Sequence, residues 1–322
     1  MAIPSSNYTE IITTTLNRYS SKIADNVTNH NPLLERLKRK GNADAVEGGV
    51  KILENLNYAE NGTFKWYSGL ETLDVSQSDV LTSAEFEWKE CNANVVVSGK
   101  EKAQNSGTKE SVHKLVKARV KAAERTFANQ LSESCFYSNT ENGGKSIGGF
   151  QHLVADLPSS GTVGGLDASS ESWWRNQFYD FSDEAVTASA STIQHAMNTV
   201  FINTQRGRDK IDMFIADATY FMFYLESLQA NQRFMSDETA SAGFKSLKFW
   251  GGAADVFYDS SVPANHMYGL NTDFIHYRPH SNFNVVTLEE KASINQDATV
   301  VPMYWKGNMT VSNRNLQAVI VA

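Results

Sequence analysis

Residues 106–137 are predicted to form one long amphipathic helix, and its length restricts the folds open to the chain. Apolar residues recur there at three- and four-residue steps, as they do along one face of a helix, and no proline interrupts them. A helix of about 29 residues is roughly 43 Å long. This exceeds what a compact domain needs, so we expect a strut against which other segments pack. The apolar stripe comprises Val112, Leu115, Val116, Val120, Ala123, Phe127 and Leu131.

Residues 46–98 are predicted to form a long β-excursion ahead of this helix. Two strand-like runs flank Asn61-Gly62, a dipeptide typical of a tight turn with positive φ. The excursion carries more large apolar side chains than a solvated hairpin needs, and charged residues alternate with them on the opposite face. Such an arm either lies on its own domain or reaches a neighbouring molecule. Its large apolar residues include Phe64, Trp66, Tyr67, Leu70, Phe86 and Trp88.

The remaining segments alternate between helices and strands, which indicates a mixed α+β fold. Residues 5–40 are expected to be helical in pieces, with a break at Asn31-Pro32 and little apolar surface of their own. Ser182 is the candidate N-cap of a later helix. The other expected elements are a helix at 182–204, a strand at 211–217, a helix at 218–231, a strand pair at 244–259, and strands from residue 284 to the end of the chain.

The chain is acidic, with 29 Lys and Arg against 36 Asp and Glu and a net charge of -7. A dedicated nucleic-acid-binding protein needs a positive field against phosphate, so we expect any contact with DNA to be weak and non-specific. The longest basic run lies at residues 35–42. It is either a solvated helix end or a contact with a partner or an inner surface. Its cations are Arg36, Lys38, Arg39 and Lys40.

Two further features bear on the cellular setting. Cys91 and Cys135 are too few to staple a chain of 322 residues, and no charged-then-apolar leader opens the sequence, so we expect an intracellular, reduced protein. No apolar run approaches the roughly 20 residues that are needed to cross a bilayer, and no membrane contact is predicted.

Residues 251–280 contain three aspartates and three histidines, which raises the question of a metal or acid/base site. His276 and His280 are four residues apart, a spacing that suits metal binding on a helix, but the local pattern is extended. Asp255 and Asp259 flank a strand, where carboxylates commonly bond turn backbone. The common nucleophile and dinucleotide motifs are absent as well. We therefore predict no catalytic residue, no metal site and no cofactor.

The same stretch resembles the major capsid proteins of tailed bacteriophages. Many of these carry a glycine-containing turn, a strand into Val-x-x-Asp, a proline turn and then Tyr-x-Leu-Asn; here these are Gly251-Gly252, Val256 to Asp259, Pro263 and Tyr268 to Asn271. Residues 305–320 are similar to the terminal strands of that family. The order of parts along the whole chain also agrees: an arm, a long β-loop, a long helix, a mixed domain and returning strands.

The resemblance implies an α+β chain with the Hong Kong 97-type phage capsid fold. It implies an N-terminal arm at 1–45, an extended β-loop at 46–100, a peripheral domain with the spine helix at 101–160 and 285–322, and an axial domain at 161–284. A non-enzymatic subunit is then expected, which self-assembles through hexamers and pentamers into the icosahedral head shell around double-stranded DNA. Its place would be the virion capsid, and the host cytoplasm during assembly.

Further partners follow from the resemblance. Because the chain begins with Met1 almost at the arm, we expect a separate scaffolding protein, together with a portal and a possible decoration protein. The expected subunit-interface residues lie in two groups. Those on the β-loop should pack on an adjacent subunit, and those of the basic run should pair with acidic groups or face the interior. They are Trp66, Tyr67, Phe86 and Trp88, and Arg36, Lys38, Arg39 and Lys40.

Three other interpretations stay open from the sequence. A bacterial nanocompartment shell has the same fold but encloses cargo enzymes. A soluble enzyme could assemble an active site from distant positions without any motif. A tail or adhesion β-protein would account for the strands, although the long predicted helix counts against it.

Overall fold

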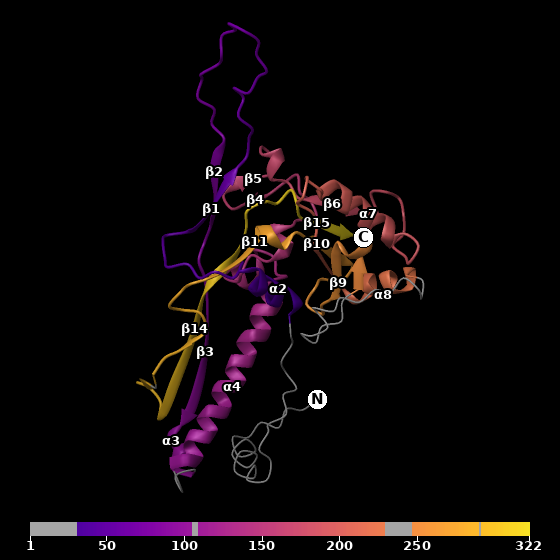
Figure 1. Cartoon of the computed structure of the whole chain (residues 1–322). Helices are drawn as coiled ribbons and strands as arrows, with labels where there is room; N and C mark the ends of the chain where they lie inside the picture. The colour runs from indigo at the N-terminus through magenta and orange to yellow at the C-terminus, as the bar shows by residue number, and fades with distance from the viewer. Residues whose placement is uncertain (1–30, 105–108, 229–246, 290) are drawn as a thin grey trace.

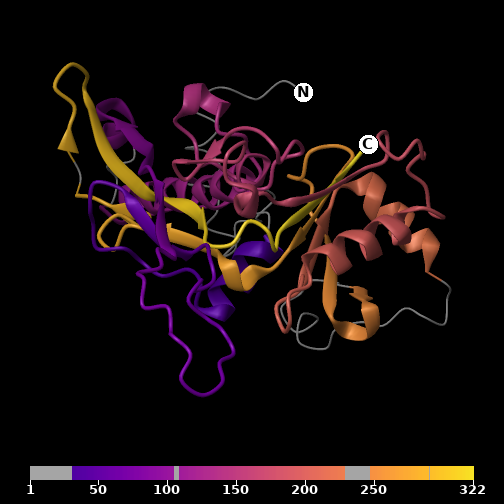
Figure 2. The same cartoon turned by 90° about the horizontal axis from the view of Figure 1, so that it is seen from above.

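The computed structural model describes residues 31–104, 109–228, 247–289 and 291–322. The predicted helical piece before Asn31 lies outside the described residues. In Figure 1 an extended β-loop leaves one end of the molecule and the long helix α4 runs toward the other. Figure 2 shows two sheet-containing parts side by side. The mixed α+β architecture predicted from the sequence is confirmed.

The first part is built on a six-stranded sheet. Helices α7 (Ile193–Thr204) and α8 (Ala218–Ser227) pack on it, and their apolar sides share one core with the inward residues of the strands. The predicted strand at 211–217 and the helix after it are confirmed. The strand order is β6 (Gln177–Asp180), β15 (Ala318–Val321), β10 (His266–Leu270), β7 (Met213–Ala216), β9 (Ala254–Tyr258) and β8 (Leu247–Phe249).

The second part is built around one long strand, β14 (Ala298–Val311). Antiparallel partners lie on it throughout its length, which gives a five-stranded sheet. Helix α4 (Lys109–Ser134) runs beside this sheet (Figure 1), and its 26 residues confirm the predicted strut, about 39 Å long. The partners of β14 are β3 (Lys89–Ser98), β11 (Ile275–Pro279), β12 (Val286–Thr287) and β13 (Lys291–Ala292). The short α3 (Gly99–Gln104) connects β3 with α4.

The strand pairing divides the chain at other points than the boundary at 284/285 expected from the sequence. Strand β11, expected in the axial domain, pairs with β14 in the five-stranded sheet. Strand β15, expected in the peripheral domain, pairs with β6 and β10 in the six-stranded sheet. The chain therefore crosses between the two parts near residues 271–274 and again near 312–317. Sequence periodicity identifies a strand but carries no information about its partner.

The second of these crossings is fixed by a buried arginine. Arg314 is 0% exposed, and its guanidinium donates to the carbonyl oxygens of Leu153 at 2.7 Å and Trp174 at 3.0 Å and to the amide oxygen of Asn176 at 3.0 Å. Burial lowers the pKa of Arg314 to about 10. These bonds tie the segment between β14 and β15 to α6 (Phe150–Leu153) and to the 3-10 helix Ser172–Trp174.

Two short segments complete the connection between the parts. The first is the single turn α5 (Glu141–Gly144), which follows α4. The second is the two-residue hairpin of β4 (Thr162–Val163) and β5 (Leu166–Asp167), which lies against the base of the β-loop, where the Gly164 carbonyl accepts from the Glu85 amide at 2.8 Å.

Two expectations about local structure are wrong. The helix predicted at 182–204 begins only at Ile193, after Thr192, because residues 182–192 form turns in which Ala185 has φ 52°. The β-excursion contains one antiparallel pair, β1 (Ile52–Asn57) with β2 (Leu81–Phe86), joined by residues 58–80 without a strand. Asn61 and Gly62 have no positive φ, and the Asn61 side chain instead accepts from the amide of Thr63.

Helix α2 (Pro32–Lys40) lies between the two parts (Figure 1). Asn31 caps it by accepting from the amides of Leu33 and Leu34, Pro32 occupies the first turn, and Gly41 ends it in the left-handed region with φ 76°. This confirms the short helix predicted after the Asn31-Pro32 break. Leu33 and Leu37 are 0% exposed and join the core that contains α4 and β14.

Candidate interaction surfaces

The tip of the β-loop is the largest group of exposed apolar side chains among the described residues. Trp66 is 90% exposed and Tyr67 63%, and both lie in the strandless segment 58–80. The segment projects past the rest of the molecule (Figure 1). Large apolar groups on a monomer surface are usually covered by a partner. We call this group the loop tip: Phe64, Trp66, Tyr67, Leu70, Leu73 and Val75, each at least half exposed.

The tip has local contacts that shape it without covering it. The rings of Phe64 and Trp66 meet edge to face with centroids 5.8 Å apart. Lys65 donates to the Thr72 carbonyl across the loop, and the Gly62 amide donates to the Ser78 hydroxyl at 3.4 Å. These bonds hold the two sides of the loop together and leave its apolar side chains in solvent.

Phe86 and Trp88, which the sequence grouped with Trp66 and Tyr67, occupy the base of the loop instead. Phe86 is 5% exposed and packs in the chain's own core. Trp88 is half-buried, its Nε1 donates to the Gly49 carbonyl at 2.9 Å, and its ring lies 5.5 Å from that of His280. These two side chains hold the loop to its own chain, so of the four only Trp66 and Tyr67 are free to meet another molecule.

The basic run is divided between two faces of α2. Arg36 and Lys40, four residues apart, lie on the side that faces the six-stranded sheet. Lys38 and Arg39 are exposed, and Arg39 pairs with Glu35 at 3.4 Å along the helix. Arg36 and Lys40, like Arg39, thus pair with acidic groups of their own chain. A place for the basic run in a subunit interface stays a prediction.

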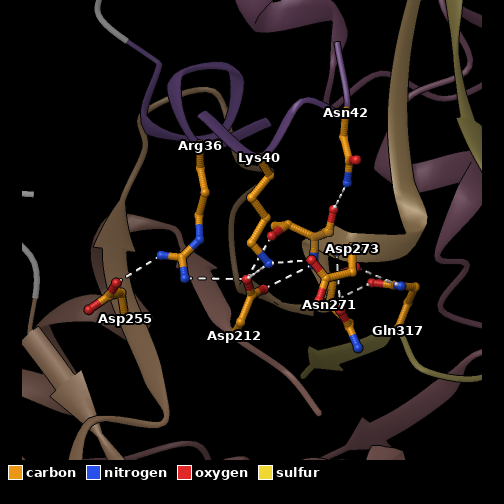
Figure 3. A network of polar contacts seen from close by, with 9 residues as sticks. Arg36, Lys40, Asn42, Asp212, Asp255, Asn271, Asp273 and Gln317 are labelled. Atoms are coloured by element: carbon orange, nitrogen blue, oxygen red, sulfur yellow. Dashed lines mark hydrogen bonds and ion pairs between the residues drawn. The ribbon is translucent and has the colours of Figure 1, made fainter. Parts of the chain in front are cut away.

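Arg36 and Lys40 meet three carboxylates where the two parts of the molecule join (Figure 3). Arg36 lies 2.8 Å from Asp255 Oδ2 on β9 and 3.2 Å from Asp212 Oδ2, just before β7. Lys40 Nζ lies 2.6 Å from the same Asp212 oxygen and 2.7 Å from Asp273 Oδ1 in the 3-10 helix η4 (Thr272–Phe274). We call these five residues the α2 clamp.

Asp212 is the centre of the clamp. Its Oδ1 accepts from the Thr272 amide at 2.9 Å, and its Oδ2 accepts from the Thr272 hydroxyl at 2.7 Å. Burial opposes ionisation of this carboxyl, but the charges of Arg36 and Lys40 outweigh it and hold the Asp212 pKa below its ordinary value. A carboxylate that binds two cations and a backbone amide fixes α2 relative to β7 and η4.

Amide side chains extend the clamp toward the C-terminal strand (Figure 3). Asn42 donates to the Thr272 carbonyl at 2.6 Å. Gln317 accepts from the Asn271 amide at 2.9 Å and donates to the Asn271 carbonyl at 3.2 Å. Sequence reasoning missed Asn42, Asp212 and Gln317, and it noted Asp273 only as one of the aspartates of 251–280. These residues are separated by up to about 275 positions, and no motif links them.

The aspartates and histidines of residues 251–280 do not converge on one site. Asp259 accepts from the Ser261 amide at 2.9 Å, which confirms the predicted turn contact. Asp255 was expected to do the same, and it binds Arg36 instead. His276 lies on β11 opposite Thr310. Within the described ranges, no three His, Cys, Asp or Glu side chains are grouped so that they could hold a metal ion.

The chain also has a hollow of about 550 Å³ between α4, β3 and the segment 142–147. Its walls include Phe127, Leu131 and Trp305. Cys91, an exposed free cysteine, also lines it. Of the helices that the structure describes, none combines the length and apolar character needed to cross a membrane.

No protein-family model matches the sequence, and no curated protein matches it either. Solved structures, in contrast, match its fold along nearly the whole chain. The capsid subunit of cyanophage A-1(L) is 11% identical with a TM-score of 0.64, covering 95% of this chain and 96% of that one. The capsid subunit of Myoviridae phage XM1 is 12% identical with a TM-score of 0.58, covering 96% and 97%.

A shell protein of another kind also matches. An encapsulin from Synechococcus elongatus PCC 7942, solved as a holo complex, is 9% identical with a TM-score of 0.52, covering 100% of this chain and 96% of that one. At identities this low, the likeness concerns the arrangement of the chain in space. It extends over nearly the whole length of the chain.

Proposed function

Because the chain has the Hong Kong 97-type capsid fold, we propose that it is a major capsid protein, a structural subunit that assembles through hexamers and pentamers into the icosahedral head shell of a tailed bacteriophage. The single observation that carries this proposal is the loop tip, which leaves Trp66 and five further apolar side chains in solvent on a fold found in shell subunits. An isolated chain gains nothing from such a tip, whereas a subunit can bury it on the next copy.

The parts of the fold receive roles under this proposal. The arm would end in α2, and the β-loop would span 46–100. The peripheral domain would comprise α4 and the five-stranded sheet, to which the β-loop segment contributes β3, and the axial domain the six-stranded sheet with α7 and α8. The domain limits then follow the sheets, so β11 is peripheral and β15 axial.

Charge supports a weak relation to the enclosed genome. At a net charge of -7, the subunit does not offer phosphate a strongly attractive wall, and Arg36 and Lys40 are neutralised by their own carboxylates. The proposed partners are therefore further copies of the chain first. A scaffolding protein, a portal and a decoration protein remain predictions, as do the virion and the host cytoplasm as places of residence.

Electron microscopy of the purified protein, expressed with and without its neighbouring genes, tests the proposal. Closed shells or flat hexameric sheets are expected in at least one of the two preparations. A monodisperse monomer in both would overturn it. Shells that enclose a protein cargo in place of DNA would instead favour the nanocompartment function, for which the match to the encapsulin is the specific observation.

A further inference from the structure

Strand β1 carries a charged residue in the middle of its buried face. The strand alternates buried and exposed residues, and the buried set is Ile52, Glu54 and Leu56, which are 2%, 8% and 3% exposed. A carboxylate at such a position loses its hydration, so it is costly unless a partner compensates it. An apolar residue would suit the position better if packing were the only requirement.

Glu54 finds its partners on two neighbouring strands of the five-stranded sheet. Its Oε1 lies 3.0 Å from Arg278 Nε on β11 and accepts from the Thr310 hydroxyl on β14 at 2.7 Å. Its Oε2 lies 3.5 Å from Arg278 Nη2. Asp44 is a weaker second partner of Arg278, at 3.7 Å. Glu54 of the β-loop thus binds both β11 and β14, the strands on which the base of the loop packs.

This contact has a directional character that the surrounding apolar contacts lack. Ile52, Leu56, Ala84 and Phe86 pack in the core, and apolar packing tolerates small shifts. The guanidinium–carboxylate pair requires a fixed geometry. If β1 slipped by two residues, Ile52 or Leu56 would face Arg278, and Glu54 would be buried without a partner. The contact therefore selects one register of β1 on the sheet.

We propose that Glu54, Arg278 and Thr310 form a positioning contact that sets the direction in which the β-loop leaves the subunit. This inference rests on the proposed function, in which the loop tip must reach a second copy. A small change of angle at β1 moves the tip far, because residues 58–80 extend well beyond the sheet (Figure 1). The contact fixes the orientation of the β-loop more than it adds to the free energy of unfolding, since apolar replacements of buried ion pairs are often neutral or stabilising.

The double substitution Glu54→Leu with Arg278→Leu separates an effect on the orientation of the β-loop from an effect on the stability of the fold. Spin labels on Ser68→Cys in the loop and Asn203→Cys on α7, in a Cys91→Ser background, report the distance from tip to body by pulsed electron paramagnetic resonance. We expect one narrow distance distribution in the parent chain. In the double variant we expect a distribution at least twice as wide, or a shifted one, with the midpoint of urea unfolding unchanged or raised.

An unchanged distance distribution in the folded double variant would overturn the proposal. Glu54→Gln serves as the second variant if the double one does not fold, because it keeps the size and the bond to Thr310 while it loses the charge; it should broaden the distribution in the same sense. Lys51→Gln with Glu85→Gln is the matched control. This exposed pair joins the residue before β1 to β2 at 2.6 Å, without contact to β11 or β14, and should leave the distribution as in the parent.

Assembly provides the second readout. Under conditions in which the parent forms shells, the double Leu variant should give at least a fivefold lower yield of closed shells, or shells of several diameters. Yield and diameter equal to the parent's would contradict the proposal. If the parent itself forms no shells, the proposed function fails, while the spin-label distances still decide whether Glu54 aims the loop.

Discussion

At the scale of single residues, Trp66 is the position whose surroundings least suit an isolated chain. The Trp66 indole is 90% exposed, so the isolated chain gains no free energy from burying it. In an interface, a buried indole is one of the largest apolar contributions to binding. Tyr67 lies beside it, and Phe64 supports its ring from one edge. These side chains are expected to dominate the contact of the loop tip with the next copy.

Trp66→Ala should impair assembly while the single chain stays folded. Loss of one aromatic at the centre of an interface costs about 2 kcal/mol or more, which is roughly a 30-fold weaker pairwise association. Far-ultraviolet circular dichroism should be unchanged, since the side chain packs on no core residue. Shell yield by sedimentation is the measurement.

Leu157→Ala is the control for this substitution, because Leu157 is also an exposed apolar residue, at 70%, but belongs to the segment between α6 and β4 and not to the β-loop. It should assemble like the parent. Equal shell yields for Trp66→Ala and the parent would remove Trp66 from the interface.

Gly149 illustrates a residue whose identity is set by close packing. A Cβ at this position would lie 2.3 Å from the carbonyl oxygen of Cys135, at the end of α4. That oxygen also accepts from the Phe150 amide at 2.7 Å, so neither backbone segment has room to move. The glycine permits α6 to pack against the end of the long helix.

Gly149→Ala should therefore lower the free energy of unfolding by about 2 kcal/mol, as other overpacking substitutions do. Gly62→Ala is the matched control: a Cβ there meets no atom within 4 Å, so its effect should stay within about 0.5 kcal/mol. Urea unfolding of the two variants measures the difference. Equal stabilities would show that the chain relaxes around Gly149.

At the scale of secondary-structure elements, the α2 clamp determines how the arm helix sits between the two sheets. Leu33 and Leu37 bind α2 to one core, and Arg36 and Lys40 bind it to the other part through Asp212 and Asp255. The carboxylates of Asp212 and Asp255 are largely buried, so water screens their pairs with Arg36 less than it screens a surface ion pair.

Asp212→Asn should destabilise the chain at neutral pH by about 1–3 kcal/mol, the range for hydrogen bonds to charged groups. Because the folded-state pKa of Asp212 is depressed below 3.8, the carboxylate's contribution is present above that value and is lost as pH falls through the folded pKa. The difference between parent and variant should therefore be constant from about pH 5 to 7 and shrink below about pH 4.

Urea unfolding of both proteins at several pH values makes this comparison. Glu35→Gln, which breaks only the exposed pair with Arg39, should change stability by less than about 0.5 kcal/mol. A difference between the parent and Asp212→Asn that persisted to pH 3 would show that charge at Asp212 is not what stabilises the clamp.

Elements with a local signal were predictable from the sequence. The 3.6-residue period of α4, the Asn31-Pro32 start of α2, and the run of apolar residues in β7 each depend on neighbours in the chain. The start of helix α7 was predicted too early, because Ser182 and the two acidic residues after it have the pattern of a helix N-terminus. The Ser and Thr residues before Ile193 instead favour turns.

Long-range partners were not predictable in the same way. Asp255 could be identified as a polar residue on a strand, but its choice of Arg36, 219 positions away, depends on the crossing of the two sheets. Phe86 and Trp66 carry the same apolar signal and end in opposite environments, one in the core and one in solvent. Periodicity within a strand does not show where the strand ends. Residues 58–80 have no strand partner, so the pairing of β1 with β2 does not continue into them.

At the scale of the whole molecule, the chain combines two firmly packed parts with one feature that a monomer cannot satisfy. The sheets, α4 and the α2 clamp form a body with two buried cores, while the loop tip lies outside it (Figure 1). In the proposed shell, repetition of the chain around symmetry axes would offer each tip the surface of another copy, and closure would leave none of the tips uncovered.

The most direct test of this account is a cryo-electron microscopy structure of the particles that the purified chain forms. The account predicts a closed shell in which residues 64–75 of every subunit are covered by a neighbouring copy, with Trp66 buried in that contact. Particles in which the tips face solvent, or a chain that remains monomeric at every concentration and with every neighbouring gene product present, would contradict it.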